Sequence, residues 1–177
     1  GGDKTAMKTT IKVAGHRSAF KEDLKLTAEL ESGLLTYTTG DSRVIDRFFL
    51  NSRKMRGFDA GGIGPRECSN RQCGVSKNDA LGGENYAVVR FEAEFPLGLP
   101  DEYGMSGGLF YDIGNLWSLK QVNNNVLYED GSWRQAIGAS LFWKTPIGPL
   151  RFNFSDVLKK EQYDRDESFD LTISTRF

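Results

Sequence analysis

The sequence predicts an all-β fold, an antiparallel transmembrane β-barrel. Three observations favour it: polar and apolar side chains alternate along several segments, no segment shows the period of a helix, and short and long connections alternate. Because a membrane barrel turns only every second residue toward lipid, its strands look half polar. A mean hydropathy of −0.46 therefore agrees with a barrel, although no apolar run approaches the roughly 18 residues of a membrane-spanning helix.

The first strands are expected in AMKTTIKVA (residues 6–14) and DLKLTAELE (residues 23–31), where apolar side chains recur at every second position. The short polar stretch GHRSAFKE joins them and contains His16, the single histidine, which is interpreted as a solvated turn residue rather than a catalytic base. A long connection follows, from about Thr36 to Gly83. Its segment RKMRGFDAGGIGPR is too basic for a core.

Five further strands complete the expected set of about seven. They are ENYAVVRFEAEFPL (84–97), YGMSGGLFYDIGN (103–115), WRQAIGASLFWK (133–144), PLRFNFSD (149–156) and SFDLTISTRF (168–177). The connections PLGLPDE and TPIGP are short, whereas SLKQVNNNVLYEDG and VLKKEQYDRDES are longer. Outer-membrane barrels have this asymmetry, with short turns on the periplasmic side and long loops outside.

The last segment shows the clearest alternation. Phe169, Leu171, Ile173 and Phe177 share one face, which we expect to contact lipid, while polar residues such as Asp170 occupy the other. The final strand would then run inward and end at the periplasmic face. A lipocalin-like barrel or an immunoglobulin-like sandwich is the alternative, but it would bury such bulky side chains.

Charge and composition narrow the function classes. The chain has 177 residues, the length of one domain, and its net charge of −1 does not indicate a nucleic-acid partner. Charges of both signs are expected to face the lumen, whereas a ring of one sign would indicate an ion-selective pore. These charges are Lys8, Lys12, Lys25, Glu29, Glu31, Arg90, Glu92, Glu94, Arg134, Lys144 and Arg151. No catalytic constellation is visible, so the sequence predicts neither an enzyme nor a cofactor.

Two cysteines, Cys68 and Cys73, lie in the long connection and are separated by four residues. A zinc site is not expected, because further cysteine and histidine ligands with suitable spacing are missing. A disulfide is the favoured interpretation, since it would suit an oxidising cell envelope and stiffen the outer part of the loop. Two free thiols are the alternative.

The same connection contains RKMRGFDAGGIGPR, residues 53–66, which is rich in both arginine and glycine. Its MRGF and IGPR segments resemble the arginine-glycine-aromatic signature loop of the BamA family of outer-membrane protein insertases. GGENYAVVRFEAEFPL, FYDIGNLW, FWKTPIGPLRF and the terminal aromatic strand resemble the last strands of that family's barrel, in the same order. Met55 departs from the branched aliphatic residue more usual before the arginine.

The resemblance implies that the loop folds back into the barrel lumen, where its arginine pairs with acidic groups on the inner wall. The signature residues are Arg56, Gly57, Phe58, Gly64 and Pro65. The alternation of the strands independently places Glu92 and Asp112 on the polar face, so both are candidate partners of Arg56. An arginine can hold a carboxylate through two parallel hydrogen bonds, which would fix the orientation of the loop.

The resemblance also implies that residues 1–177 are the C-terminal part of an outer-membrane barrel, without the periplasmic POTRA domains and the N-terminal half-barrel of the family. The implied function is the folding and insertion of outer-membrane β-barrel proteins. Nascent outer-membrane proteins, the lipoproteins of the BAM complex and the lipid bilayer are the implied partners. A TamA-like factor, a two-partner secretion transporter and a passive porin are the alternatives.

Two consequences of the predicted fold remain. Seven strands alone would leave two unpaired edges in lipid, so the remainder of the barrel or another copy must close the sheet. The apolar residues of the terminal strand, Phe169, Leu171, Ile173 and Phe177, are also expected to act as a recognition signal, because substrates of this family likewise end in an aromatic residue.

Overall fold

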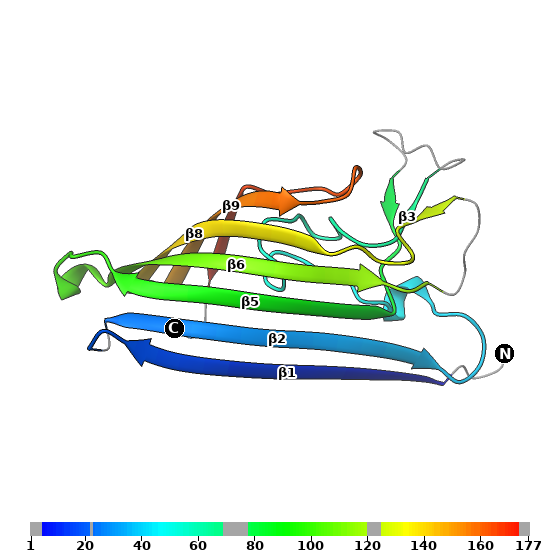
Figure 1. Ribbon diagram of the computed structural model, residues 1–177, viewed down its shortest axis with the longest axis horizontal. Coiled ribbons are helices and arrows are strands. Elements are labelled where there is room, and N and C mark those ends of the chain that lie inside the picture. Colours follow the sequence, from blue (N-terminus) through cyan, green and yellow to red (C-terminus); the bar gives the residue numbers. More distant parts are fainter. Residues whose placement is uncertain (1–4, 22, 69–77, 120–124, 174–177) are drawn as a thin grey trace.

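The computed structural model describes residues 5–21, 23–68, 78–119 and 125–173, and it consists of one large antiparallel sheet with a long connection packed against it (Figure 1). The predicted all-β antiparallel fold is confirmed. The strands of the large sheet are β1 (Ala6–Ala19), β2 (Leu24–Tyr37), β5 (Asn85–Pro96), β6 (Met105–Trp117), β8 (Arg134–Thr145), β9 (Gly148–Lys159) and β10 (Phe169–Ile173). They are hydrogen-bonded in the order β1-β2-β5-β6-β8-β9-β10, so β1 and β10 form the two ends of the sheet.

The remaining elements are short and lie in the connections. They are the 3-10 helices η1 (Val44–Asp46) and η3 (Asp101–Tyr103) and the strands β3 (Arg66–Glu67), β4 (Asp79–Ala80) and β7 (Val126–Leu127). The three short strands form a second sheet in the order β4-β3-β7. Sequence alternation did not reveal them, because a strand of two residues has no period. Among the described residues, no helix is long and apolar enough to cross a membrane.

Two expected connections are shorter than predicted. β1 continues to Ala19, so His16 lies in a strand and not in a turn, and β9 continues through Val157 to Lys159. In the first case Gly15 and Arg17 occupy positions of the apolar face and break the alternation that marks a strand. The expected strand 168–177 is described as far as Ile173, and Phe177 lies outside the described residues.

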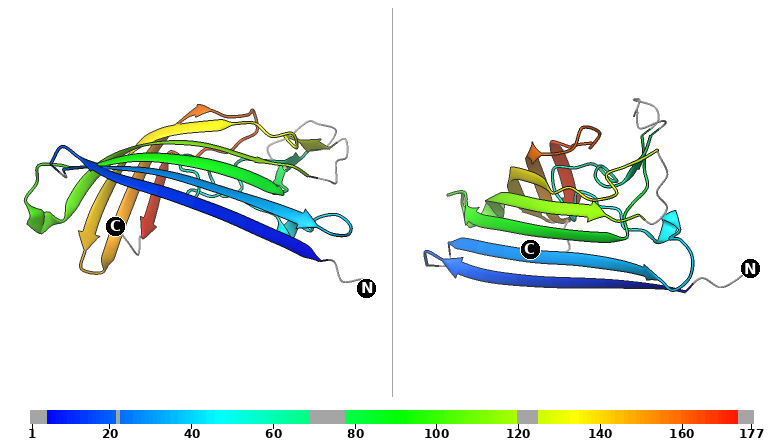
Figure 2. Two further views of the ribbon diagram at one scale, coloured as in Figure 1. Left: turned by 60° about the horizontal axis from the view of Figure 1, so that its bottom comes forward. Right: turned by 45° about the vertical axis from the view of Figure 1, so that its right-hand side comes forward.

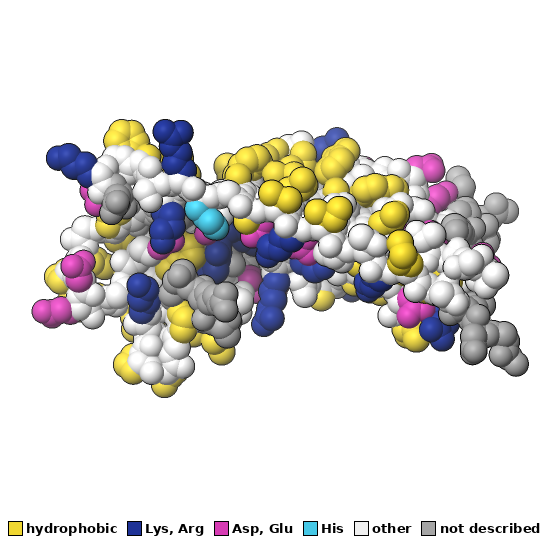
Figure 3. Space-filling model, turned by 90° about the horizontal axis from the view of Figure 1, so that it is seen from below, with side chains coloured by type: hydrophobic (Ala, Val, Ile, Leu, Met, Phe, Trp, Pro, Cys, Tyr) yellow, Lys and Arg dark blue, Asp and Glu magenta, His cyan; other side chains and the backbone are white. Residues whose placement is uncertain are grey.

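The sheet is strongly curved, and the long connection between β2 and β5 lies on its concave side (Figure 2). Apolar side chains on the convex face remain exposed, among them Ile11, Leu30, Phe91, Leu109 and Phe154. In Figure 3 hydrophobic side chains gather along this outer face, while charged side chains gather in the hollow beneath it. The alternation predicted from the sequence therefore separates an apolar outer face from a charged inner one.

The buried core lies between the sheet and the connection. Met55, Phe58 and Ile63 of the connection are at most 2% exposed and pack with inner-face residues such as Val88 and Leu116. These inner-face residues lie near the strand ends that adjoin the long connection, where apolar residues take the place of charged ones. The loop therefore packs on an apolar surface, and the rest of the inner face is charged.

Candidate functional site: an arginine held on the lumen wall

The long connection enters the concavity through backbone pairing at both ends. Phe48 and Gly83 exchange backbone hydrogen bonds of 2.9 and 3.0 Å, which close the base of the loop. Deeper in the lumen, Asp59 N–H donates to Arg165 O over 3.1 Å, and Glu167 N–H donates to Gly57 O over 2.9 Å. The loop is therefore bound to the connection between β9 and β10 as well as to the sheet.

Arg56 projects from this loop onto Asp112 of β6. The guanidinium donates through Nε to Oδ2 over 2.9 Å and through Nη2 to Oδ1 over 2.6 Å. The backbone N–H of Arg56 also donates to Oδ2, over 2.9 Å. Both oxygens of a carboxylate whose side chain is 0% exposed are thus occupied by one residue, which fixes the direction of the backbone as well as the side chain.

Glu92 of β5 is the second partner of the same arginine. Its carboxylate accepts a hydrogen bond from Arg56 Nη1 and another from Nη2 of Arg151, a residue of β9. The guanidinium of Arg56 also lies 4.0 Å from the ring centroid of Phe110, and that of Arg151 lies 4.8 Å from that of Phe142. We call Arg56, Asp112, Glu92 and Arg151 the arginine clamp, because they tie the loop to three different strands.

Burial and charge act in opposite directions on Arg56. Removal from water lowers the pKa of the guanidinium, but the hydrogen bonds and negative charge of Asp112 and Glu92 outweigh it and raise the pKa above its usual value. The charged form of Arg56 is consequently favoured by its two partners. Two carboxylates face two guanidinium groups in the clamp, so its charges balance.

The glycines beside Arg56 are required by close contacts. Gly57 has φ of +92°, and a Cβ at that position would lie 2.9 Å from the Cβ of Ala136 in β8. Gly64 has φ of +106°, and its Cβ would lie 2.6 Å from Leu116 Cδ2. Both positions therefore combine a left-handed backbone with a wall that leaves no room for a side chain.

The other signature residues are buried around the clamp. Phe58 is 2% exposed and pairs through its backbone with Asp166. Pro65 is also fully buried, and Arg66 beside it donates to Gly61 O over 2.7 Å and to Asn78 Oδ1 over 3.0 Å. The structure thus brings Arg56, Gly57 and Phe58 to the wall while Gly64, Pro65 and Arg66 form the return path.

A second charged cluster lies beside the clamp, and its ion pairs were not predicted from the sequence. Arg90 donates to Lys54 O over 2.6 Å and to Glu31 Oε2 over 2.8 Å, and it also contacts Glu29. The Tyr86 hydroxyl donates to Glu31 Oε1 over 2.7 Å. The strand register would have predicted part of this cluster, because Glu29, Arg90 and Asp112 occupy directly opposed positions on neighbouring strands.

Another buried ion pair fixes the outer connection. Arg134 Nε lies 2.7 Å from Asp164 Oδ2, and both side chains are 0% exposed. The sequence predicted that Arg134 faces the lumen. It could not predict the partner Asp164, which lies in a connection whose path the sequence does not specify. Alternation identifies the face of a strand residue and gives no information about a loop residue.

The remaining predicted site residues lie apart from the clamp. Phe169, Leu171 and Ile173 are 47%, 52% and 68% exposed on the convex face, away from the loop. Cys68 is disulfide-bonded, whereas its expected partner Cys73 lies outside the described residues.

His16 contacts Thr27 Oγ1 through Nδ1 over 3.2 Å on the exposed inner face of β1. Among the described residues, no group of three or more histidine, cysteine, aspartate or glutamate side chains could hold a metal ion.

Comparison with known proteins places this geometry in a family. The model of the Omp85 superfamily domain matches residues 1–177. The chain is 32% identical to an outer membrane protein assembly factor BamA of Neorickettsia risticii over all of its length, and 26% identical to that of Neisseria meningitidis serogroup B over 70% of it. It spans 23% and 17% of those two relatives.

A solved structure shares the fold. The crystal structure of Haemophilus ducreyi BamA lacking POTRA domains 1–3 superposes with a TM-score of 0.78 at 20% identity, over 94% of this chain and 34% of that one. The resemblance to the BamA family and the outer-membrane location are therefore confirmed. The chain belongs to the Omp85 superfamily and represents a BamA-like portion of an outer-membrane β-barrel.

Proposed function

We propose that residues 1–177 are the C-terminal part of a barrel that catalyses the folding and insertion of outer-membrane β-barrel proteins. The observation that carries the proposal is the arginine clamp, in which one buried loop arginine satisfies Asp112 completely and shares Glu92 with Arg151. The curated relatives that the chain matches are outer membrane protein assembly factors.

The clamp supports this function mechanically. A buried ion pair does not by itself add much stability, but a network that joins β5, β6 and β9 to one loop fixes the loop in a single position. An assembly barrel must loosen one seam to template an incoming strand while the rest of its wall stays closed. The clamp joins the loop to β5, β6 and β9, so it would hold this part of the wall in place, and β9 is also the strand that pairs with β10.

The end of the sheet supplies the proposed templating element. β10 pairs with β9 over Phe169–Ile173 and is the last strand of the sheet, so its other side is available to a further strand. Backbone hydrogen bonds at such an edge give affinity, and side chains on alternate positions select the partner. In the complete barrel this strand would close against the remainder of the sheet, and nascent outer-membrane proteins would compete for the same edge.

The terminal aromatic residue is proposed as an assembly signal of the protein itself. Deletion of Phe177 should lower the amount of folded protein in the outer membrane much more than Thr172→Ser does. Equal amounts of these two variants, measured by heat-modifiable gel mobility, would remove Phe177 from the proposed signal.

The lipoproteins of the BAM complex are proposed as further partners of the complete protein.

Reconstitution tests the proposed function. The complete barrel protein is inserted into phospholipid vesicles, an unfolded outer-membrane protein is added, and folding is followed by gel mobility. We expect folding to be faster than in protein-free vesicles. If folding is not accelerated but a secreted passenger crosses the membrane, the chain belongs to a transporter of the same superfamily, and steady ion conductance alone would indicate a porin.

A further inference from the structure

The outer face of the sheet contains a hollow that the proposed function does not use. It has a volume of about 680 Å³ and lies across β1, β2, β5, β6 and β8. This volume is within the range of sites that bind small molecules. The hollow opens on the face opposite the arginine clamp, where the side chains are apolar and exposed.

Strand register explains why a hollow forms here. Gly15, Ala28, Phe91, Tyr111 and Ile137 are directly opposed along one rung of the sheet. The first two side chains are small and form a floor, whereas the last three are large and form a wall. The rings of Phe91 and Tyr111 stack with centroids 6.4 Å apart, which makes that wall continuous.

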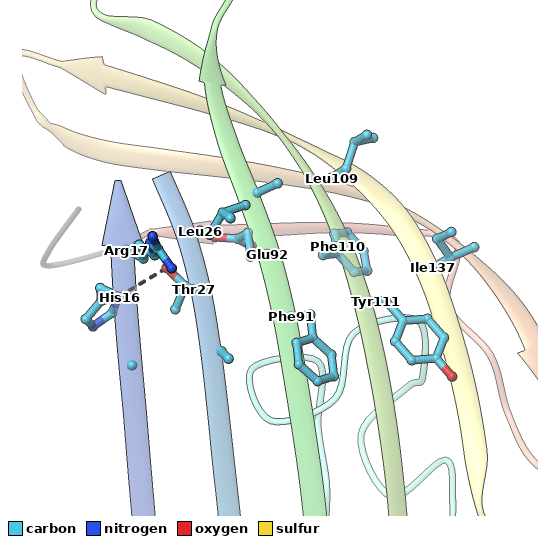
Figure 4. A pocket seen from close by; sticks show the side chains of 13 residues that line it. His16, Arg17, Leu26, Thr27, Phe91, Glu92, Leu109, Phe110, Tyr111 and Ile137 are labelled. Carbon is cyan, nitrogen blue, oxygen red and sulfur yellow. Dashed lines mark hydrogen bonds between the residues drawn. The ribbon is translucent and has the colours of Figure 1, made fainter. Parts of the chain in front are cut away.

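The next rung toward the periplasmic end consists of Arg17, Leu26, Ala93 and Leu109. Ala93 is opposed to Leu26 on one side and to Leu109 on the other, and it continues the floor. Figure 4 shows Leu26 and Leu109 among the side chains that line the hollow. Arg17 is the one charged side chain of this rung. It lines the hollow at the edge strand β1 and also borders a lumen-side cavity with Lys25 and Glu94. The hollow therefore has an apolar body and a cationic end.

Arg17 is exposed, and none of the described carboxylates lies within ion-pair distance of it. It stands two residues before the end of β1 at Ala19, or about 7 Å along a strand. A cation on the lipid face is costly near the middle of a bilayer and costs little near its surface. The guanidinium can also extend along the wall toward the headgroups.

We propose that this hollow is a binding site for one glycerophospholipid of the periplasmic leaflet. The phosphate accepts hydrogen bonds from the Arg17 guanidinium, a geometry that suits its planar donors. An acyl chain extends from there along the floor of Gly15, Ala28 and Ala93, between Leu26 and the Phe91–Tyr111 wall. The direction matches a bilayer, because the cationic end is the one nearer the periplasmic turns.

Lipid titration tests the site. The complete barrel protein in detergent is titrated with palmitoyl-oleoyl phosphatidylglycerol, and bound lipids are counted by native mass spectrometry. Arg17→Gln should weaken the tightest binding step about tenfold, because it removes a charged hydrogen-bond donor. Lys144→Gln is the matched control: it removes a cation near the same end of the sheet but on the lumen side, and should leave binding unchanged.

Two further measurements separate the phosphate from the acyl chain. Palmitoyl-oleoyl glycerol, which lacks the phosphate, should bind the original protein and Arg17→Gln equally weakly. Ala28→Leu fills the floor and should weaken phosphatidylglycerol binding, whereas Ala139→Leu, on the outer face beyond the hollow, should not. Gel mobility verifies that each variant is folded. If Ala28→Leu does not fold, the binding measured for Arg17→Gln decides the proposal by itself.

Unchanged phosphatidylglycerol binding by folded Arg17→Gln would overturn the proposal. Equal binding of the diacylglycerol and the phospholipid by the original protein would do the same. So would a dimer that displaces bound lipid and is lost in Ala28→Leu, because the hollow would then be an interface between two copies. None of these results depends on whether the barrel accelerates assembly.

Discussion

At the scale of single residues, the two carboxylates of the arginine clamp differ in what they do. Asp112 is 0% exposed and accepts three hydrogen bonds from Arg56, whereas Glu92 is 17% exposed and is shared with Arg151. Loss of Asp112 would leave the buried guanidinium without its bidentate partner. Loss of Glu92 would leave Arg56 still paired and would mainly affect Arg151.

Asp112→Asn should therefore lower the free energy of unfolding by about 3 to 5 kcal/mol, the usual cost of breaking a buried ion pair. Glu92→Gln should cost about 1 to 3 kcal/mol, as expected when a partly buried charged acceptor becomes neutral. Urea titration of the complete barrel in lipid vesicles measures both. Arg53→Gln, at an exposed position of the same loop, is the control. A larger effect of Glu92→Gln than of Asp112→Asn would contradict the assigned order.

At the scale of elements, the loop depends on a close approach to β8. Gly57→Ala should destabilise the protein by about 1 to 3 kcal/mol, because the added methyl group would overlap Ala136 and the backbone is left-handed. Gly15→Ala is the matched control: nothing lies within 4 Å of its Cβ position, so its effect should stay within about 0.5 kcal/mol. Equal unfolding midpoints for the two variants would mean that the loop does not need this contact.

The terminal strand provides a test of register. Leu171 is 52% exposed on the convex face, while the neighbouring Thr172 lines the lumen cavity. Leu171→Arg should cost up to about 2 to 4 kcal/mol, depending on its depth in the bilayer, because it places a charge against lipid. Thr172→Glu should cost much less, because it places a charge in the lumen opposite Arg151. The folded fraction after refolding into vesicles measures the difference, and the reverse order would mean that β10 is displaced by one residue.

The elements also show how far the sequence leads. Alternation was sufficient to predict the strands of the large sheet and the inner-face positions of Glu92 and Asp112, because every second residue of a strand faces the same solvent. Alternation did not predict the last residues of β1, because Arg17 occupies a position of the otherwise apolar face. It could not pair Arg134 with Asp164, because the path of a connection depends on distant contacts rather than on a local period.

At the scale of the whole molecule, the sheet has two faces, two rims and two ends. The connections β1–β2, β5–β6 and β8–β9 lie at one rim, whereas the longer connections β2–β5, β6–β8 and β9–β10 lie at the other. We expect the rim with the long connections to face the cell exterior, because outer-membrane barrels have their long loops outside. The loop of the arginine clamp would accordingly enter the lumen from outside.

Cysteine labelling tests this orientation in intact cells. A cysteine at the exposed Gln162, in the β9–β10 connection, should react with a membrane-impermeant maleimide. A cysteine at Ile147, which is 91% exposed in the short β8–β9 turn, should react only after the outer membrane is opened. Labelling of Ile147 alone in intact cells would mean that the barrel has the opposite orientation.

The central claim is that the clamp holds the loop in the position that an assembly barrel needs, and its most direct test is the rate of assembly. The complete barrel is reconstituted in vesicles with an unfolded outer-membrane protein, either unchanged or with Asp112→Asn or Asp156→Asn. Asp156 is exposed on β9 and lies outside the clamp. We expect Asp112→Asn to slow folding of the added protein severalfold and Asp156→Asn to leave it unchanged. Equal rates for all three, with equal amounts of folded barrel, would contradict the account.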